Sequence, residues 1–281
     1  MATKIIVDSA SDITINEAKQ LGIELIPIEV RFGDEEYLDG VNITHSEFYE
    51  KLALSQEPPQ TSQINPFRFE EELEKSTRNG DDVILITMSS KLSGTYRNAL
   101  LAADKFNGKV HVVDSLNATI GQRLLALYAL KLAAQNIPAK TIANILEDAK
   151  KRLKVIAAID TLEYLKKGGR ISATSAMIGT MLSIKPLIQV IDGEVKVVGK
   201  ALGTKKKYAM LTQLINNTNG IDYDMPLCFV FSGSTQGLEE YINQIPEIVN
   251  KAASPIVSYS LGCTIGTHIG PGAIGISFFE K

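Results

Sequence analysis

The chain has 281 residues, of which 44% are hydrophobic and 22% are charged, as is typical of a globular protein with a core of its own. Since one domain takes roughly 150 residues, this length predicts one large domain or two ordinary ones. The 29 basic and 32 acidic residues give a formal net charge of −3, which argues against nucleic acid as a partner, because nucleic-acid binding depends on a basic surface.

The cysteine content and the apolar runs lead to an expectation for the location of the protein. The two cysteines, Cys228 and Cys263, are too few for a disulfide scaffold and favour a reducing compartment. Asp8 interrupts the first apolar run, so the start lacks the pattern of a secretory signal. No uninterrupted apolar run approaches the roughly 20 residues that cross a bilayer. We therefore expect a cytoplasmic protein.

Residues 1–153 alternate short apolar runs with helical patterns, which predicts an α/β domain with a largely parallel, doubly wound sheet and helices on both faces. Thr44 and Glu47 form a capping-box pattern, and Pro66 suits a first helical position. Residues 60–65 follow two prolines and predict a loop. Extended segments are expected at 4–7, 23–32, 83–88 and 110–113, and helices at 15–21, 44–54, 66–77, 95–106, 118–134 and 142–153.

Residues 154–281 predict a second, mixed-sheet α+β domain. Asp192-Gly193 between two apolar runs is the strongest hairpin signal in the chain. A glycine-rich segment, 262–275, connects the last two predicted strands. The expected strands are 155–159, 186–190, 194–198, 227–231, 256–260 and 273–279, and the expected helices are 205–217 and 237–251. We expect a ligand site near the junction of the two domains.

Two aspartates follow the first predicted strand. Asp8 and Asp12 would suit a phosphate-ester-binding enzyme with a metal-binding carboxylate cluster, together with the weakly phosphate-loop-like segment 168–170. The favoured alternative is that Asp8 ends the strand and that Ser11 or Asp12 caps the next helix. No set of His, Cys or acidic residues has the spacing of a metal site, so we expect none.

Hydroxyl groups and one imidazole are the other candidates for chemistry. Ser93-Gly94 precedes a predicted helix, where it would bind an anion at the positive helix end or simply cap the helix. Thr61 and Ser62 place two hydroxyls on the proline-bounded loop, which is otherwise an ordinary turn. His268 lies among glycines that leave its imidazole accessible. A Ser93–His268 pair would suit an acyl-ester hydrolase, but Ser93 lacks the Gly-x-Ser-x-Gly pattern.

Seven motifs spread over the whole chain occur in the order found in a known family. They are Asp8-Ser9…Asp12, TSQ at 61–63, SKLSGTY at 90–96, VDS at 113–115, DTLEYLKKGGRI at 160–171, IKP at 184–186 and GTHIGPG at 266–272. By these motifs the sequence is identified as a member of the DegV family of bacterial fatty-acid-binding proteins, and it is similar to the binding subunit of fatty-acid kinase.

The resemblance implies a non-enzymatic, cofactor-free, two-domain α/β protein. Such a protein holds one long-chain fatty acid in an apolar tunnel and presents it to a separate kinase subunit, which forms the acyl phosphate. Carried over by position, Thr61 and Ser93 would hydrogen-bond the carboxylate, with His268 close by. Gly94 would offer a backbone N–H, and Ser62 lies beside Thr61. Transient contact with a membrane surface would serve ligand exchange.

The same resemblance suggests where the kinase docks. The candidates are Arg170 and a basic run that starts a predicted helix, Lys205, Lys206 and Lys207. Such a run is otherwise typical of a solvated helix face. The family commonly carries an arginine just before this run, where this chain has Ala201-Leu202-Gly203, so here the lysines would take over docking or no kinase is served. The TSQ motif is commonly followed by proline, and here by Ile64.

The two ends of a fatty acid have different requirements. About 14 buried methylenes at about 0.8 kcal/mol each are worth on the order of 11 kcal/mol before ordering costs, so the tail supplies most of the affinity. Hydroxyls, a helix-start N–H and an imidazole would hold the carboxylate without a full counter-charge. The apolar segments 118–132 and 176–187 supply candidate tunnel residues.

Overall fold

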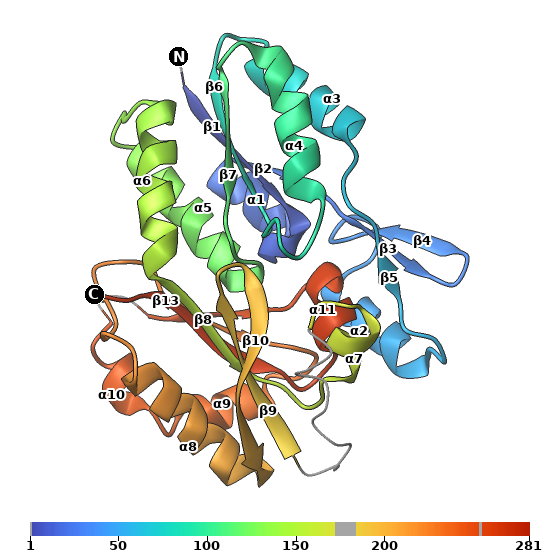
Figure 1. The fold of residues 1–281 in the computed structure, drawn as a ribbon, viewed down its shortest axis with the longest axis vertical. Helices are drawn as coiled ribbons and strands as arrows, with labels where there is room; N and C mark the ends of the chain where they lie inside the picture. The colour runs from blue at the N-terminus through green and yellow to red at the C-terminus, as the bar shows by residue number, and fades with distance from the viewer. Residues whose placement is uncertain (1, 172–183, 253–254) are drawn as a thin grey trace.

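Four buried runs of the first half form a parallel sheet, which we describe from a computed structural model covering residues 2–171, 184–252 and 255–281. The strands are ordered β2 (Ile23–Ile26), β1 (Thr3–Asp8), β6 (Asp82–Thr87) and β7 (Val110–Asp114). On one face α3 (Pro66–Thr77) packs against α4 (Thr95–Ala103), and on the other α5 (Thr119–Ala133) packs against α6 (Ala139–Arg152), as Figure 1 shows. The expected doubly wound parallel sheet is therefore present.

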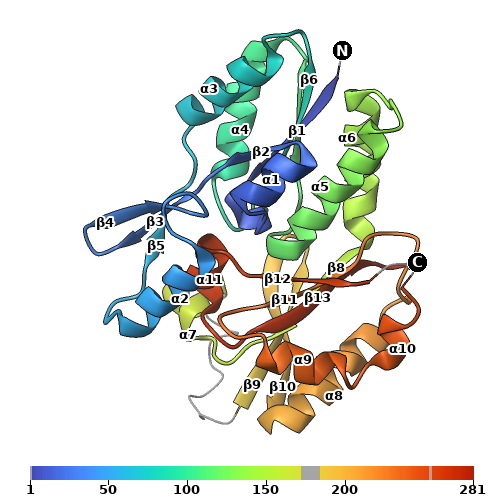
Figure 2. The same cartoon turned by 180° about the vertical axis from the view of Figure 1, so that it is seen from behind.

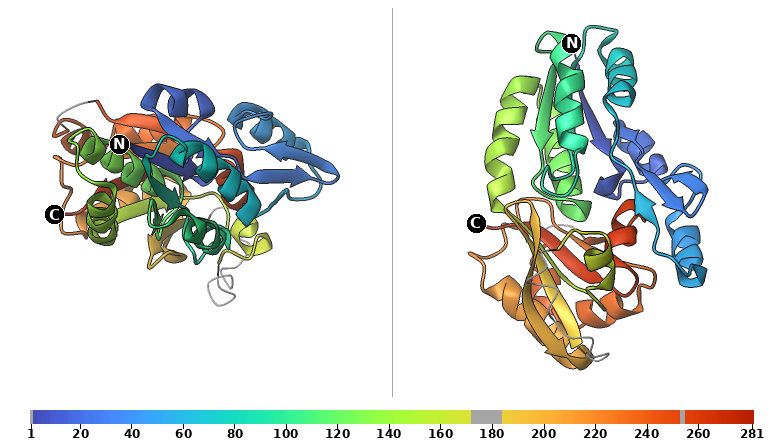
Figure 3. Two further views of the ribbon diagram at one scale, coloured as in Figure 1. Left: turned by 90° about the horizontal axis from the view of Figure 1, so that it is seen from above. Right: turned by 45° about the vertical axis from the view of Figure 1, so that its right-hand side comes forward.

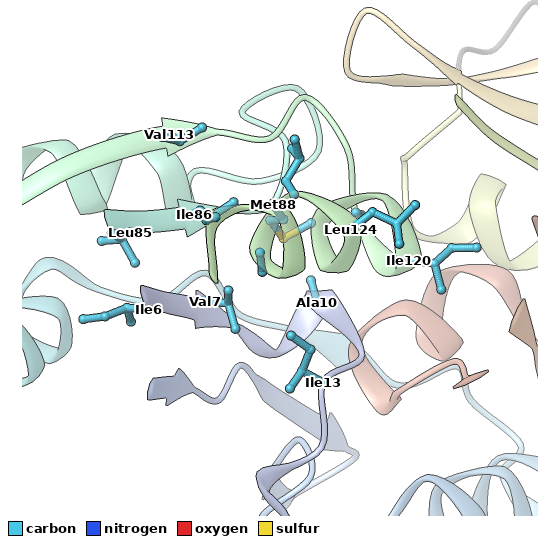
Figure 4. Packing of buried hydrophobic residues seen from close by; sticks show 14 of the residues in the cluster. Ile6, Val7, Ala10, Ile13, Leu85, Ile86, Met88, Val113, Ile120 and Leu124 are labelled. Carbon is cyan, nitrogen blue, oxygen red and sulfur yellow. The ribbon is translucent and has the colours of Figure 1, made fainter. Parts of the chain in front are cut away.

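The parallel sheet has apolar residues on both faces, and helices cover both. Ile6 and Val7 of β1 and Leu85 and Ile86 of β6 are fully buried, and consecutive residues of a strand point to opposite faces. Figure 4 shows Val7, Ile86 and Met88 near α5, the helix that carries Ile120 and Leu124. The short helix α1 (Ile15–Leu21) lies next to β2 and begins at a capping box formed by Thr14 and Glu17.

Six strands of the second half form a mixed sheet. Its order is β10 (Glu194–Leu202), β9 (Ile184–Ile191), β8 (Leu153–Ala158), β13 (Ile274–Phe279), β11 (Cys228–Phe231) and β12 (Val257–Ser260); all neighbours are antiparallel except β11 and β12. Its outer face is covered by α8 (Gly203–Asn216), α9 (Gln236–Ile242) and α10 (Pro246–Val249), which Figure 2 shows from behind. The expected mixed-sheet α+β region is thus confirmed.

The helix α5 lies between the two sheets and contacts strands of both, namely β1, β6, β8, β11 and β13. One continuous apolar cluster accordingly contains Ile86 of the parallel sheet and Val155 and Val230 of the mixed sheet. The helix α6 ends at Arg152 and β8 begins at Leu153, next to the division that we predicted between residues 153 and 154. The division into two domains at this point stays a prediction.

A third, smaller unit projects from the first half, and we call residues 29–61 the arm. It consists of an antiparallel sheet ordered β4 (Glu35–Leu38), β3 (Glu29–Phe32) and β5 (Gln60–Thr61), with α2 (His45–Leu54) inserted between β4 and β5. The arm packs against α11 (Cys263–Ile269), which also contacts the short helix α7 (Glu163–Lys167). Figure 3, right, shows α11 in red beside the blue arm.

Several local predictions are confirmed. Thr44 and Glu47 form both bonds of the capping box, and Pro66 opens α3. The predicted hairpin joins β9 to β10, with Asp192 and Gly193 both at positive φ, as a two-residue turn requires. Within the part of the chain that the structure describes, no helix is both long and apolar enough to cross a membrane.

Other local predictions were wrong. Thr14 caps α1, rather than Ser11 or Asp12. The helix expected over 237–251 is interrupted before Pro246, since a helix interior does not accommodate proline. The loop expected over 60–65 starts with the two-residue strand β5, and the glycine-rich segment 262–275 contains the helix α11.

Candidate functional site

A cavity of about 250 Å³ lies between the mixed sheet, the start of α5, and α11. Most of its wall is apolar. The face of the mixed sheet that looks toward α5 contributes Val155, Ala157, Ile188, Val190, Val195 and Val230, and further apolar residues come from the helices and loops around it. Ala118 contributes from the predicted tunnel segment 118–132, and Ile188 follows the segment 176–187, of which residues 176–183 lie outside the described residues. Polar groups from four separate segments line another part of the same wall.

The helix α4 brings the first of these groups. Gly94 is the N-cap residue and α4 begins at Thr95, so the serine does not occupy the cap position that was one of our two interpretations. The Ser93 hydroxyl instead accepts a hydrogen bond from the Thr95 N–H (3.2 Å) and pairs with the Thr95 hydroxyl (2.9 Å). Both Ser93 and Gly94 line the cavity. A Cβ at Gly94 would lie 1.8 Å from Gln63 Oε1, so glycine here admits the side chain of Gln63.

The arm brings the second group. Thr61 pairs with Val30 across β5 and β3. The next residue, Ser62, donates its backbone N–H to the Glu29 carbonyl (3.1 Å) and its hydroxyl to Glu29 Oε1 (3.2 Å). Thr61 and Ser62 line the cavity together with Gln63, which belongs to the TSQ motif but to which we assigned no role. The pairing with β3 therefore fixes the loop that we expected the prolines to hold.

His268 lies in the last turn of α11, and its Nε2 is 3.0 Å from Thr61 Oγ1. Its Nδ1 is buried and has no hydrogen-bond partner among the residues that the structure describes. Burial, together with the nearby positive charge of Arg170, lowers the pKa of His268 to about 4, so the imidazole is neutral at pH 7. A Cβ at Gly168 would lie 2.2 Å from Nδ1, so glycine there makes room for the ring.

Arg170 is the fourth contributor, in a place that we did not predict. Its Nε donates to the Leu92 carbonyl (3.1 Å) and its Nη1 to the Gly168 carbonyl (2.5 Å), and the side chain lines the cavity. We expected Arg170 to dock a partner protein and the site to hold only neutral donors. The left-handed turn at Gly169 (φ 68°) is the local signal that directs this arginine back onto the loop before α4.

The three lysines of the basic run do not share one environment. Lys205 and Lys206 are exposed on the first turn of α8, which covers the outer face of the mixed sheet. Lys207 is buried, and burial lowers its pKa. A solvated face over all three lysines is therefore wrong, and a docking role for Lys205 and Lys206 stays a prediction.

The geometry speaks against both rival chemistries. A hydrolase needs a hydrogen bond between nucleophile and base, whereas Ser93 pairs with Thr95 and His268 with Thr61. The carboxylates of Asp8 and Asp12 accept from the backbone N–H groups of Ala10, Met88 and Gly262. Among residues 2–171, 184–252 and 255–281, no three His, Cys, Asp or Glu side chains are grouped to hold a metal ion.

Comparison with known proteins places the whole chain in one family. Residues 2–281 match the family described as "Uncharacterised protein, DegV family". A DegV domain-containing protein of Caldanaerobacter subterraneus is 34% identical over 99% of this chain and 98% of its own length. A similar protein of Halalkalibacterium halodurans is 31% identical over 98% of this chain and 97% of its own length.

Solved structures agree over their full length. A DegV family protein from Thermus thermophilus, described for its fatty acid binding, has a TM-score of 0.89 at 29% identity, and each chain is covered completely. DegV of Bacillus subtilis, described as a fatty acid binding protein, has a TM-score of 0.84 at 28% identity, again with complete coverage of both chains. This chain therefore belongs to the DegV family.

Proposed function

We propose that this protein binds one long-chain fatty acid, with its tail against the apolar wall of the cavity and its carboxylate among Thr61, Ser62, Ser93, Gly94 and His268. The observation that carries the proposal is a single cavity with an apolar sheet face and a localised set of hydrogen-bonding groups. A ligand that suits both parts has a long hydrocarbon chain and one polar end. The related structures described as fatty-acid-binding support the same ligand class.

The polar groups suit a carboxylate in particular. The hydroxyls of Thr61 and Ser93 can each donate one hydrogen bond, and bonds to a charged acceptor are the stronger kind. Arg170 adds the positive charge that sequence reasoning left out, and a guanidinium suits a carboxylate. Because the His268 imidazole is neutral, it can donate through only one of its two nitrogens at a time. Thr61 and His268 share one hydrogen bond, and the tautomer of the imidazole decides which of them donates it. The carboxylate therefore accepts a hydrogen bond either from the Thr61 hydroxyl or from the imidazole N–H.

We further propose that the protein presents the fatty acid to a separate kinase subunit and is not itself an enzyme. Ser93 pairs with Thr95 and His268 with Thr61, so the serine is not hydrogen-bonded to the imidazole that would have to activate it, which favours holding a ligand over breaking a bond. The partner would phosphorylate the carboxylate, with no cofactor supplied by this chain. Both cysteines are buried and unpaired, which is consistent with action in the cytoplasm.

Mass spectrometry of the purified protein tests the ligand. Denaturing extraction is expected to release a saturated or unsaturated long-chain acid in about equimolar amount. The delipidated protein is expected to take up palmitate or oleate saturably at one site, and octanoate far more weakly, because each lost methylene costs about 0.8 kcal/mol. Absence of an acyl chain together with absence of saturable uptake contradicts the proposal.

A coupled assay tests the second part. The loaded protein mixed with ATP alone is expected to form no acyl phosphate, whereas addition of a fatty-acid kinase subunit is expected to give it. Formation of acyl phosphate or ester hydrolysis by the chain alone contradicts the non-enzymatic role. Lys205→Glu and Lys206→Glu together are expected to weaken this transfer without changing fatty-acid affinity, if the kinase docks on α8.

A further inference from the structure

The start of α11 is held by two buried carboxylates from distant parts of the chain. The first four N–H groups at the start of a helix lack partners within it, and the N-cap residue of α11, Gly262, has no side chain to bind them. Asp12 Oδ1 accepts from the Gly262 N–H (2.8 Å). Asp39 Oδ1 accepts from the Cys263 N–H (3.0 Å), and Asp39 Oδ2 accepts from the Thr264 N–H (2.9 Å). Three of the four orphan donors are therefore satisfied by carboxylates from distant parts of the chain.

The approach of these groups depends on a glycine. A Cβ at Gly262 would lie 3.1 Å from Asp12 Oδ1 and 3.4 Å from Asp39 Oδ1, and 3.0 Å from His45 Nε2. These contacts are tighter than ordinary van der Waals contact, so a larger residue would require the carboxylates, the imidazole or the helix start to shift. The geometry at this end of α11 is therefore tightly determined.

The arm holds both ends of α11. Asp39 follows β4 and binds the first turn, whereas Thr61 lies in β5 and meets His268 in the last turn. Between these points, a Cβ at Gly266 would lie 2.5 Å from Phe48 of α2, so the helix backbone rests directly on the arm. A short helix held in this way moves as one piece.

Thr264 connects the contact with Asp39 to the cavity, because it lies on the same helix as His268. The two residues are four positions apart, so they lie on the same face of α11, and both line the cavity. The Thr264 hydroxyl donates to Asp39 Oδ2 (2.5 Å), in addition to the bond from its backbone. The anchor and the imidazole are thus one helical turn apart on one rigid face.

We propose that Asp39, assisted by Asp12, is a positioning residue for His268: it fixes α11 in the register that brings His268 Nε2 to Thr61 Oγ1. This inference rests on the proposed function only for its ligand. The register itself is a property of the ligand-free protein. Weakening the Asp39–Thr264 bond is expected to displace the imidazole while leaving the fold intact.

The test compares two isosteric substitutions on the same helix in the full chain. Thr264→Val removes the hydroxyl bond to Asp39, whereas Thr267→Val removes a buried hydroxyl that donates only to the Cys263 carbonyl of its own helix (2.9 Å). Side-chain NMR of the three histidines in the delipidated protein reports the imidazole directly. Thr264→Val is expected to shift the His268 signals, Thr267→Val to leave them in place, and Thr264→Ser to restore them.

Fatty-acid affinity gives the second readout. Thr264→Val is expected to lower palmitate affinity about threefold to tenfold, the loss that one misplaced hydrogen bond gives, and Thr267→Val much less. In a His268→Gln background the effect of Thr264→Val is expected to vanish, because the two substitutions remove the same interaction. Equal His268 shifts in both valine variants, or additive losses, overturn the positioning role. Shifted His268 signals in a protein that binds no fatty acid would contradict the proposed function and leave this inference standing.

Discussion

The two parts of the cavity wall are built in different ways. A large share of the apolar part comes from alternate residues of one sheet: Val155 and Ala157 of β8 line the cavity, whereas Ile156 and Ala158 lie in the core beneath α8. The polar part comes from segments far apart in sequence. Thr61 and His268, which are 207 positions apart, meet at 3.0 Å. A strand pattern thus supplies the sheet's share of the apolar wall, whereas the polar part depends on contacts between distant segments.

This difference separates affinity from orientation. An apolar wall attracts a hydrocarbon chain in proportion to the area that it buries, without a strict geometry. Hydrogen bonds to a carboxylate depend on distance and angle, so small displacements of the polar groups reduce them. We therefore expect blocking the apolar wall to cost most, and single changes at the polar end to cost less.

The largest effect on fatty-acid affinity is expected from Ala157→Phe, which places a bulky side chain in the apolar wall of the cavity. Displacing four or five methylenes at about 0.8 kcal/mol each predicts a loss of affinity of roughly 100-fold or more. Titration of the delipidated protein with palmitate measures it. Ala53→Phe makes the same chemical change on the exposed surface of α2 and serves as the control. Unchanged palmitate affinity in Ala157→Phe would place the tail elsewhere.

The next effect is expected on stability and concerns His268. Its pKa in the folded protein is about 4, below the 6.5 of an exposed histidine. Between these values the unfolded chain binds a proton that the folded chain does not, so stability falls as the pH decreases from 6.5 to 4. The shift amounts to an upper limit of about 3 kcal/mol. Urea unfolding of wild type and His268→Gln measures it.

The comparison with His268→Gln isolates this histidine. Burial raises the pKa of Asp8 to about 6 and that of Asp12 to about 7, and these carboxyl groups change stability in the opposite direction. Both proteins contain them, so their contribution cancels in the difference. A difference in unfolding free energy that is constant from pH 4 to 6.5 would show that the imidazole is not desolvated.

The sequence predicts the features that depend on local patterns and misses those that depend on contacts between distant segments. Short apolar runs that alternate with helical patterns predicted the parallel sheet, the Asp192-Gly193 turn predicted the hairpin, and a capping box predicted the start of α2 at Thr44. The helix α11 was missed because glycine has low helix propensity, and Gly262 and Gly266 are there for close approach to other segments. Carboxylates that lie more than 200 positions away support this helix, and no local pattern reports them.

Some residues of the polar part of the cavity were predicted from the sequence, and one was not. Thr61, Ser93 and His268 were predicted through a family resemblance, and the structure brings them to one cavity, although their roles toward a carboxylate stay predictions. Arg170 was interpreted as a partner-docking residue through the same resemblance, and no local pattern places it in the cavity wall. Its position depends on the carbonyls of Leu92 and Gly168, which only the fold brings together.

Arg170→Gln is expected to have an intermediate effect on affinity. A hydrogen bond to a charged group contributes about 1.5–3 kcal/mol, so its loss predicts a decrease of roughly tenfold to 100-fold. The pKa of His268 is also expected to rise, because the positive charge that helps to depress it is removed. Arg97→Gln changes an exposed arginine on α4 and is the matched control. Equal affinities of the two variants would remove Arg170 from the head-group site.

The smallest effect is expected from Ser93→Ala, and it sharpens the placement of the head group. Ser93 lines the cavity, and in the proposed complex its hydroxyl donates one hydrogen bond to the carboxylate, so its loss predicts a decrease in palmitate affinity of about threefold to tenfold. Ser115→Ala is the paired variant, because the Ser115 hydroxyl is buried and donates to the Asn117 carbonyl (2.9 Å). We expect Ser115→Ala to lower the unfolding free energy by about 1 kcal/mol and to leave affinity and transfer to the kinase unchanged. If the two variants lose affinity equally, the carboxylate does not lie beside α4, because only one of these hydroxyls faces the cavity.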